Sequence, residues 1–306
     1  MIYHESIVEH QRSVELTLHT NATDPALAPV LGATAAGTAT KESSRGLAIT
    51  VLGELMRPTG GSAWTQTISE TLALLGVREK AARQTIARLH QQGWLERLRV
   101  GRQTRWSLTG MATELLTDGA ARIYGFGTHR PEWDGDWAVL LASVPERQRD
   151  RRYRLGVGLT WAGFGSLGQG TWISPWSTRE AEAVRTMRDL DVEGFSFRGA
   201  LGELGSPRDL AAQAWDLDEM RSSYDAFIAD WADAAPIDSV DTVRHLVLLV
   251  HRWRRFPFLD PGLPAALLPD DWPAPTAVDR FGELRAAWTE TATGWWLDTD
   301  DRYTPG

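Results

Sequence analysis

Positive charge is concentrated in one short stretch of a chain whose formal net charge is −8. Residues 77–108 hold eight basic side chains against two acidic ones, Glu79 and Glu96. The basic residues are Arg78, Lys80, Arg83, Arg88, Arg97, Arg99, Arg102 and Arg105. Such a cluster on an acidic protein predicts a surface that binds a polyanion, and DNA fits this pattern best.

The last third of the chain has the opposite charge. Residues 201–306 hold nine Arg and no Lys against nineteen Asp and Glu side chains. Free nucleic acid is therefore expected to be repelled by this part and attracted to residues 77–108.

The elements before the basic cluster are predicted to be two helices. Apolar residues between Leu47 and Leu55 recur at helical spacing, and Pro58 ends that pattern. Thr67 and Glu70 have the spacing of a capping box, in which each side chain bonds the backbone N–H of the other residue. A second helix is therefore expected to begin at Thr67.

A third helix over residues 79–92 and a hairpin after it are predicted to carry the basic side chains. Ala82, Ile86 and Leu89 form the expected buried stripe of this helix, and Gly93 ends it. Two extended runs, over residues 94–99 and 104–108, follow around Gly101. Three helices and then a basic hairpin, in this order, predict a winged helix-turn-helix.

The third helix of such a domain reads the major groove of DNA. The residues expected to face the bases are Lys80, Arg83, Gln84, Thr85 and Arg88, because Arg pairs with guanine and Gln with adenine. On the hairpin, Arg99, Arg102 and Arg105 are expected to contact phosphates. The alternative is that these side chains form a solvated basic face without a ligand. Among the helix residues, Arg88 fits a structural role best, because it is next to the buried Leu89.

The rest of the chain divides into a middle part of mixed elements and a helical end. Extended and helical patterns alternate from Asp136 to Leu201, which predicts a small α/β or α+β domain, and Ser177 with Glu180 forms another expected capping box. The predicted domains are a flexible extension over 1–44, a DNA-binding domain with a connector helix over 45–126, a central domain over 127–205 and a helical domain over 206–306.

Two patterns that could do chemistry have simpler interpretations. Gly163 to Gly168 matches GxGxxG, but these glycines follow a predicted helix and lead into a strand, so they predict a turn and not a dinucleotide site. His245 and His251 are six residues apart, which does not fit a metal pair on a helix, so both are expected to be structural. No catalytic or metal site is predicted.

A candidate ligand set lies outside the basic cluster. Arginines along a helix predicted over residues 147–161 could hold the phosphates of a CoA ligand or contact DNA; the alternative is a solvated helix face balanced by Glu146 and Asp150. Trp161 and Trp172 could line an aryl pocket or belong to the core. The set comprises Arg147, Arg151, Arg154, Trp161 and Trp172, together with a second arginine group, Arg252, Arg254 and Arg255, which could bind the ligand or a neighbouring domain.

Composition excludes several classes of protein. The chain has no cysteine, which removes disulfides, thiolate zinc sites and cysteine nucleophiles. No apolar run approaches the length of a membrane span, and no signal-peptide pattern opens the chain. A cytoplasmic protein that is not an enzyme and carries no cofactor is therefore expected.

Residues from about 45 to 296 resemble the PaaX-like family, the bacterial repressors of phenylacetic acid degradation genes. The resemblance is carried by LLGVREKAARQTIARLHQQGWLERLRVGRQTRWSLTG, ARIYGF, WDGDWAVL, RYRLGVGLTWAGFGSLGQGTWISP and HRWRRFPFLDPGLPAALLPDDWP. It implies an α+β multidomain protein: a winged helix, a central ferredoxin-like (Cas2-like) domain and a helical C-terminal domain. It also implies a homodimeric repressor that binds double-stranded DNA and responds to phenylacetyl-CoA or a related acyl-CoA.

Two rival functions remain at this point. A metal-dependent nuclease could use a Cas2-like central domain, with Asp136 as the nearest candidate ligand. A DNA-binding protein without any ligand is the other. The operator sequence, the effector and the role of the N-terminal extension are left open.

Overall fold

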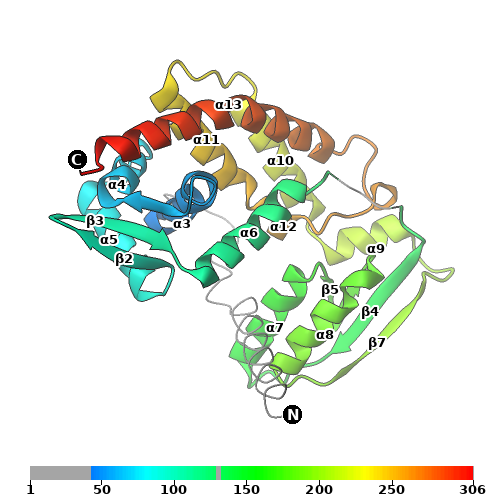
Figure 1. The fold of residues 1–306 in the computed structure, drawn as a ribbon. Coiled ribbons are helices and arrows are strands. Elements are labelled where there is room, and N and C mark those ends of the chain that lie inside the picture. The colour runs from blue at the N-terminus through cyan, green and yellow to red at the C-terminus, as the bar shows by residue number, and fades with distance from the viewer. Residues whose placement is uncertain (1–42, 129–131, 306) are drawn as a thin grey trace, which may run out of the picture. The chain divides into compact units, whose positions relative to one another are not determined.

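Ser43 begins the first helix of the structure, because its side-chain oxygen accepts a hydrogen bond from the backbone N–H of Gly46. Helix α3 (Ser44–Val51) continues into a π-helical turn, Leu52–Met56, and both are largely buried. The structure is a computed structural model that describes residues 43–128 and 132–305 (Figure 1). The predicted flexible extension over 1–44 lies outside the described residues, except for its last two.

The described residues form two compact units. Unit 1 contains residues 132–217 and Asp260–Asp270, and unit 2 contains residues 43–128, Asp218–Leu259 and 271–305. Each unit therefore combines segments that are distant in sequence. The four domains proposed from the sequence remain predictions.

Helix α4 (Thr65–Leu74) of unit 2 begins two residues before the predicted start. The capping box expected at Thr67 and Glu70 is wrong. Thr67 lies inside the helix and is fully buried, and its hydroxyl donates to a carboxylate oxygen of Asp300. Trp64 precedes the helix with extended backbone and supplies no side-chain cap.

A three-stranded antiparallel sheet follows in unit 2. Its strands are β1 (Ser62–Trp64), β2 (Leu95–Val100) and β3 (Gln103–Leu108), with β3 in the centre. The turn between β2 and β3 contains Gly101 with φ of +58°, a backbone conformation that glycine adopts readily. The hairpin matches the prediction, whereas β1 was not predicted, because three residues are too few to show alternation.

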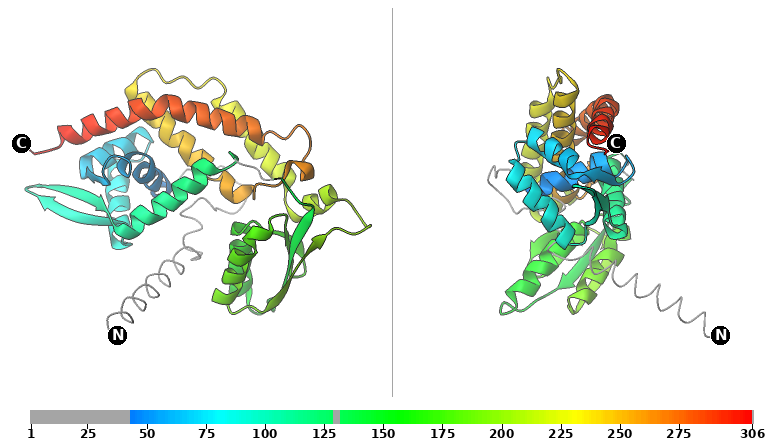
Figure 2. Two further views of the ribbon diagram at one scale, coloured as in Figure 1. Left: turned by 45° about the vertical axis from the view of Figure 1, so that its right-hand side comes forward. Right: turned by 60° about the vertical axis from the view of Figure 1, so that its left-hand side comes forward.

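Helices complete unit 2. Thr109 caps α6 (Gly110–Gly125), the predicted connector helix. The later helices are α10 (Leu217–Trp231), α11 (Ser239–Trp253), α12 (Phe256–Leu259) and α13 (Ala274–Arg302). Helices α11 and α13 lie side by side (Figure 2), and their core includes the fully buried Trp253 and Trp296.

Unit 1 is a four-stranded antiparallel sheet with helices on one face (Figure 1). The order along the chain is β4 (Asp136–Ala142), α7 (Arg149–Trp161), β5 (Gly165–Gly168), β6 (Thr171–Ser174), α8 (Glu180–Asp189) and β7 (Gly194–Ala200). The strands lie in the order β5-β6-β4-β7, and this β-α-β-β-α-β arrangement is ferredoxin-like. Ala138, Leu140 and Ala142 of β4 pack in the core with residues of both helices.

Two local predictions fall in unit 1, a capping box and a glycine turn, and the structure agrees only with the second. The capping box expected at Ser177 and Glu180 is wrong, because residues 177–179 form a short 3-10 turn and Glu180 binds Arg198 at 2.8 Å. The GxGxxG segment is a turn into strand β5, as expected. Gly163 has φ of +80°, and a Cβ there would lie 2.1 Å from Nη1 of Arg179, so the glycine makes room for that side chain.

The segment Asp260–Asp270 packs within unit 1 together with short helix α9 (Pro207–Ala214). The Trp176 indole donates to the carbonyl of Gly262 at 3.0 Å, and Arg208 pairs with Asp270 at 2.9 Å. Among the described residues, no helix is both long enough and apolar enough to cross a bilayer.

Candidate nucleic-acid interface

Helix α5 (Glu79–Gln91) presents a polar face on the side opposite its buried stripe. Ala82, Ile86 and Leu89 are at most 1% exposed, as the sequence pattern predicted. The exposed residues include Lys80, Arg83, Gln84 and Arg88. Thr85 is only 7% exposed, so its side chain faces the core and is not available on this surface.

Few internal contacts restrain the exposed face of α5. Arg78 precedes the helix without a side-chain cap. Arg83 forms an ion pair with Glu79 at 2.6 Å, but both side chains are largely exposed. Solvent-exposed pairs of this kind contribute little energy and exchange readily for other partners. The face therefore keeps two basic side chains and a glutamine available for a ligand.

Contacts at the C-terminal end of α5 fix the hairpin against it. The imidazole Nδ1 of His90 lies 2.7 Å from the carbonyl oxygen of Leu95, where β2 begins. The His90 ring also packs against Trp106 of β3, with ring centres 5.4 Å apart. Trp94 and Trp106 are buried, so both tryptophans hold the hairpin on the helices.

The hairpin carries three exposed arginines. Arg97 and Arg99 lie on β2, and Arg102 lies in the turn. With Lys80 and Arg88 they place positive charge on two neighbouring elements, α5 and the hairpin. We name this set, together with Gln84 and Arg83, the basic surface.

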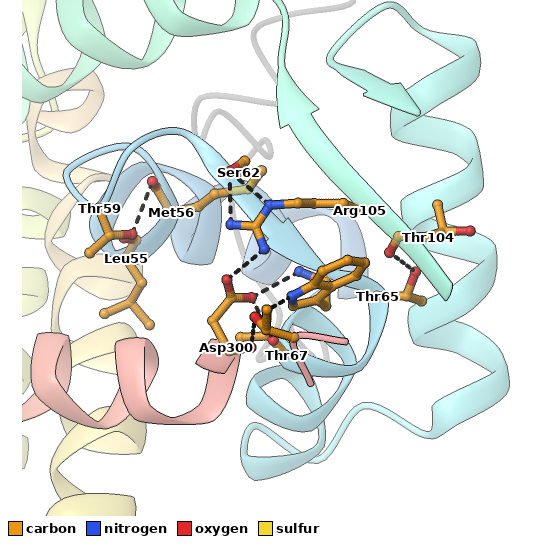
Figure 3. Close-up of polar contacts among 11 residues, drawn as sticks. Leu55, Met56, Thr59, Ser62, Thr65, Thr67, Thr104, Arg105 and Asp300 are labelled. Atoms are coloured by element: carbon orange, nitrogen blue, oxygen red, sulfur yellow. Dashed lines mark hydrogen bonds and ion pairs between the residues drawn. The ribbon is translucent and has the colours of Figure 1, made fainter. Parts of the chain in front are cut away.

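Arg105 differs from the other hairpin arginines. Its guanidinium donates to a carboxylate oxygen of Asp300 at 3.0 Å and to the hydroxyl of Ser62 at 3.0 Å, and it lies over the Trp64 ring (Figure 3). These contacts occupy it inside unit 2. The predicted phosphate contact of Arg105 is therefore not supported by its placement, and nothing local in the sequence reveals a partner 195 residues away.

A buried charge cluster connects the first helices of unit 2 to α13. Arg285 donates to Glu54 at 3.0 Å, the Tyr124 hydroxyl donates to the same carboxylate, and Arg285 stacks on the Tyr124 ring at 3.9 Å. Burial raises the pKa of Glu54, while Arg285 and Tyr124 act in the opposite direction. Burial and the nearby Glu54 also raise the pKa of Tyr124 to well above its usual value.

The three arginines of the second predicted group differ in their exposure. Arg252 is exposed and pairs with Asp230, and Arg255 is exposed. Arg254 is 5% exposed and donates to the Thr50 hydroxyl at 3.2 Å; burial lowers its pKa to about 10. Its position inside unit 2 supports a structural role and not the predicted ligand contact.

The two histidines have structural contacts. His251 Nδ1 lies 2.9 Å from the Thr50 hydroxyl, and burial, with the nearby Arg254, lowers the pKa of His251 to about 3. His245 Nδ1 lies 2.8 Å from the carbonyl of Asp241, and its ring packs against Trp288.

The predicted ligand residues of the central domain are not gathered at one place. Arg147 precedes α7 and Trp161 ends it, which separates them by about 20 Å along the helix. Arg151 is 3.9 Å from Asp191, and Arg154 is exposed. Trp172 packs against the core of unit 1, and Trp161 is half-buried. Two further arginines of α7, Arg149 and Arg152, pair with Glu146.

Asp136, the candidate nuclease ligand, is exposed at the start of β4. Within residues 43–128 and 132–305, no group of three or more His, Asp or Glu side chains could hold a metal ion.

The described residues thus form a mixed α+β protein with a helical C-terminal region and with exposed basic side chains on α5 and the hairpin. Family models match it in three successive parts: PaaX-like protein over residues 43–112, PaaX protein central Cas2-like domain over 130–211 and PaaX-like protein C-terminal domain over 215–298. The chain therefore belongs to the PaaX-like family, as the resemblance indicated.

Two individual proteins are similar to it. The transcriptional repressor PaaX of Escherichia coli (strain K12) is 29% identical over 248 residues, which are 77% of this chain and 77% of that protein. A solved structure of the uncharacterized protein Rv0674 from Mycobacterium tuberculosis matches with a TM-score of 0.55 at 22% identity. It covers 80% of this chain and 96% of that one, and the match shows a shared fold.

Proposed function

We propose that this chain is a transcriptional repressor that binds operator DNA through its basic surface. The segment from α3 to β3 acts as a winged helix-turn-helix, with α5 in the major groove and the hairpin on the phosphates. The observation that carries the proposal is the joint exposure of Lys80, Gln84 and Arg88 on α5 and of Arg99 and Arg102 on the hairpin, in a chain of net charge −8. The similarity to a protein named a transcriptional repressor supports the same role.

Two copies of the chain act together in this proposal. A dimer places its two α5 helices in successive major grooves of a roughly palindromic site. The open face of the unit 1 sheet is a suitable contact region. Phe195 and Phe197 of β7 are 72% and 55% exposed, and the register puts them opposite Leu141 and Val139 on the same face.

An acyl-CoA or aryl metabolite is the proposed effector, and phenylacetyl-CoA is the first to test. Such a ligand releases the repressor only if it binds the DNA-free state more tightly than the DNA-bound state. The role is regulatory and not enzymatic. A thermal-shift series with phenylacetyl-CoA and with CoA alone tests this part. A ligand well above its dissociation constant should stabilise the protein by about 3 kcal/mol, and equal shifts with both compounds would refute an acyl-specific site.

The DNA-binding proposal is tested with the full-length protein and fragments of the source genome. We expect a small set of fragments to be enriched, with binding that weakens steeply as salt rises. A fragment that binds no better than its scrambled counterpart would refute sequence-specific binding. Enrichment of fragments next to catabolic genes would support repression of a catabolic operon.

A further inference from the structure

The last turn of α13 forms hydrogen bonds with three elements at the base of the hairpin, β1, α4 and β3. The Asp300 carboxylate accepts hydrogen bonds from the Trp64 backbone N–H at 2.9 Å, the Thr67 hydroxyl at 2.8 Å and Arg105 at 3.0 Å (Figure 3). These donors belong to β1, α4 and β3 respectively. We name Asp300 and its three donors the Asp300 cluster.

Neighbouring residues of the same turn strengthen the attachment. Arg302 pairs with Glu70 of α4 at 3.2 Å, and the Tyr303 hydroxyl donates to the other oxygen of the same carboxylate at 3.0 Å. The Trp64 indole donates to the Thr304 hydroxyl at 3.1 Å. The end of α13 therefore restrains the beginning and the middle of α4 as well as the sheet.

A buried carboxylate is costly unless donors surround it. The Asp300 side chain is 10% exposed, and its three donors meet that requirement. Moving β3 away from α4 would remove one donor and leave the buried Asp300 carboxylate with too few hydrogen bonds. The desolvation cost of the carboxylate therefore favours one geometry of the cluster.

The position of β3 decides where the exposed arginines of the hairpin lie. Strand β3 is the central strand, and Arg105 pairs in register with Trp64 on one side and Leu98 on the other. Arg99 is opposite Thr104, next to Arg105, and Arg102 lies in the adjoining turn. A shift of β3 relative to α4 and α5 would thus move these arginines relative to the helix that enters the groove.

We propose that Asp300 is a positioning residue for DNA binding: from the end of α13 it holds the hairpin at the distance from α5 that lets both contact one duplex. The inference rests on the proposed function. It also explains why one arginine of the hairpin, Arg105, is directed into unit 2 while Arg99 and Arg102 are exposed.

The expected change in DNA affinity on losing the Asp300 carboxylate is opposite to the change expected from charge alone. Removing a negative charge from an acidic protein reduces its repulsion of DNA and should tighten binding. Loss of the Asp300 carboxylate should instead weaken binding, because the hairpin loses its fixed position. The variant Asp300→Asn removes the charge and keeps an oxygen that can accept hydrogen bonds. The variant Asp301→Asn removes the same charge from the exposed neighbouring residue and serves as its control.

The experiment measures affinity for an enriched genomic fragment by fluorescence anisotropy at several salt concentrations. Asp300→Asn should weaken binding about tenfold and make the salt dependence shallower, because fewer phosphates are contacted. Asp301→Asn should bind as the unchanged protein or slightly more tightly. Equal or tighter binding by Asp300→Asn would overturn the inference. If the unchanged protein does not bind selectively, the proposed function itself fails.

A second comparison separates positioning from general loss of stability. In an Arg97→Ala, Arg99→Ala, Arg102→Ala background the exposed hairpin arginines are already absent, so Asp300→Asn should have little further effect on affinity. An undiminished tenfold effect there would overturn the inference. Thr67→Val removes one uncharged donor and should cause a smaller loss, which keeps the test decisive if Asp300→Asn does not fold. Unchanged affinity of a folded Thr67→Val protein would then count against the inference.

Discussion

Arg285 of α13 lies 3.0 Å from Glu54, which sits in the π-helical turn after α3. The Glu54 side chain is 1% exposed, and the Tyr124 hydroxyl of α6 donates to its other oxygen. This contact joins the first helix, the connector helix and the last helix of unit 2 around one buried carboxylate. The C-terminal helix is therefore part of the structural support of the proposed DNA-binding segment.

Replacing Arg285 by alanine should destabilise the protein by about 3 kcal/mol, because it leaves Glu54 buried without its cationic partner. The measurement is the free energy of unfolding in denaturant. Arg244→Ala, which removes an exposed arginine of α11, should change it by less than about 0.5 kcal/mol. Similar values for the two variants would show that the buried pair does not stabilise the fold.

His251 should make the protein less stable in mild acid. Its pKa falls from 6.5 in the unfolded chain to about 3 in the folded protein. Between these values the unfolded state binds more protons, so stability rises with pH up to about 6.5 and is lost as pH decreases. The expected loss from pH 7 to pH 5 is about 2 kcal/mol, and His251→Asn should remove this contribution. An identical pH profile of the unfolding free energy in both proteins would contradict the prediction.

Arg102→Ala should weaken binding to matched and scrambled duplexes by the same factor. A side chain that contacts only phosphate carries no sequence information. The slope of log affinity against log salt should decrease by about one. Arg244→Ala removes the same charge from α11 and should leave that slope unchanged; a slope change of equal size in this control would exclude a specific role for Arg102.

Gln84→Ala and Arg83→Ala should reduce the preference for the matched duplex. Gln84 is exposed on α5, and the exposed Glu79 partner of Arg83 can be exchanged for a base edge. Each good base contact contributes about 1–3 kcal/mol of discrimination. The ratio of affinities for matched and scrambled sites measures the effect. A preserved ratio in both variants would place base recognition elsewhere.

Replacing Phe195 and Phe197 together by serine should convert the proposed dimer into a monomer. Both side chains project from the same face of β7, and an exposed apolar patch on a sheet favours association. Sedimentation at several protein concentrations reports the mass. Leu204→Ser changes a residue that is 89% exposed outside the strands and should leave the mass unaffected. An unchanged dimer in the phenylalanine variant would locate the interface elsewhere.

Much of the proposed site follows from the sequence. The limits of α5 and of the hairpin were predicted to within a residue or two, because the apolar side chains repeat with the period of each element and glycine marks the ends. The exposure of Lys80, Gln84 and Arg88 follows from the same period. Thr85 was misplaced because a small polar side chain on the edge of the stripe can face either way.

The amino-acid sequence by itself determined the local elements, the basic cluster and the family. It could not reveal that Asp300 fixes Arg105 and Thr67, or that Arg285 pairs with Glu54, since these partners are more than 190 residues apart. Charged side chains look alike in a sequence whether they face solvent or a buried partner. Only the packing of α11 and α13 against the first elements of unit 2 decides that Arg105, Arg254 and Arg285 are used internally, while other arginines remain on the surface.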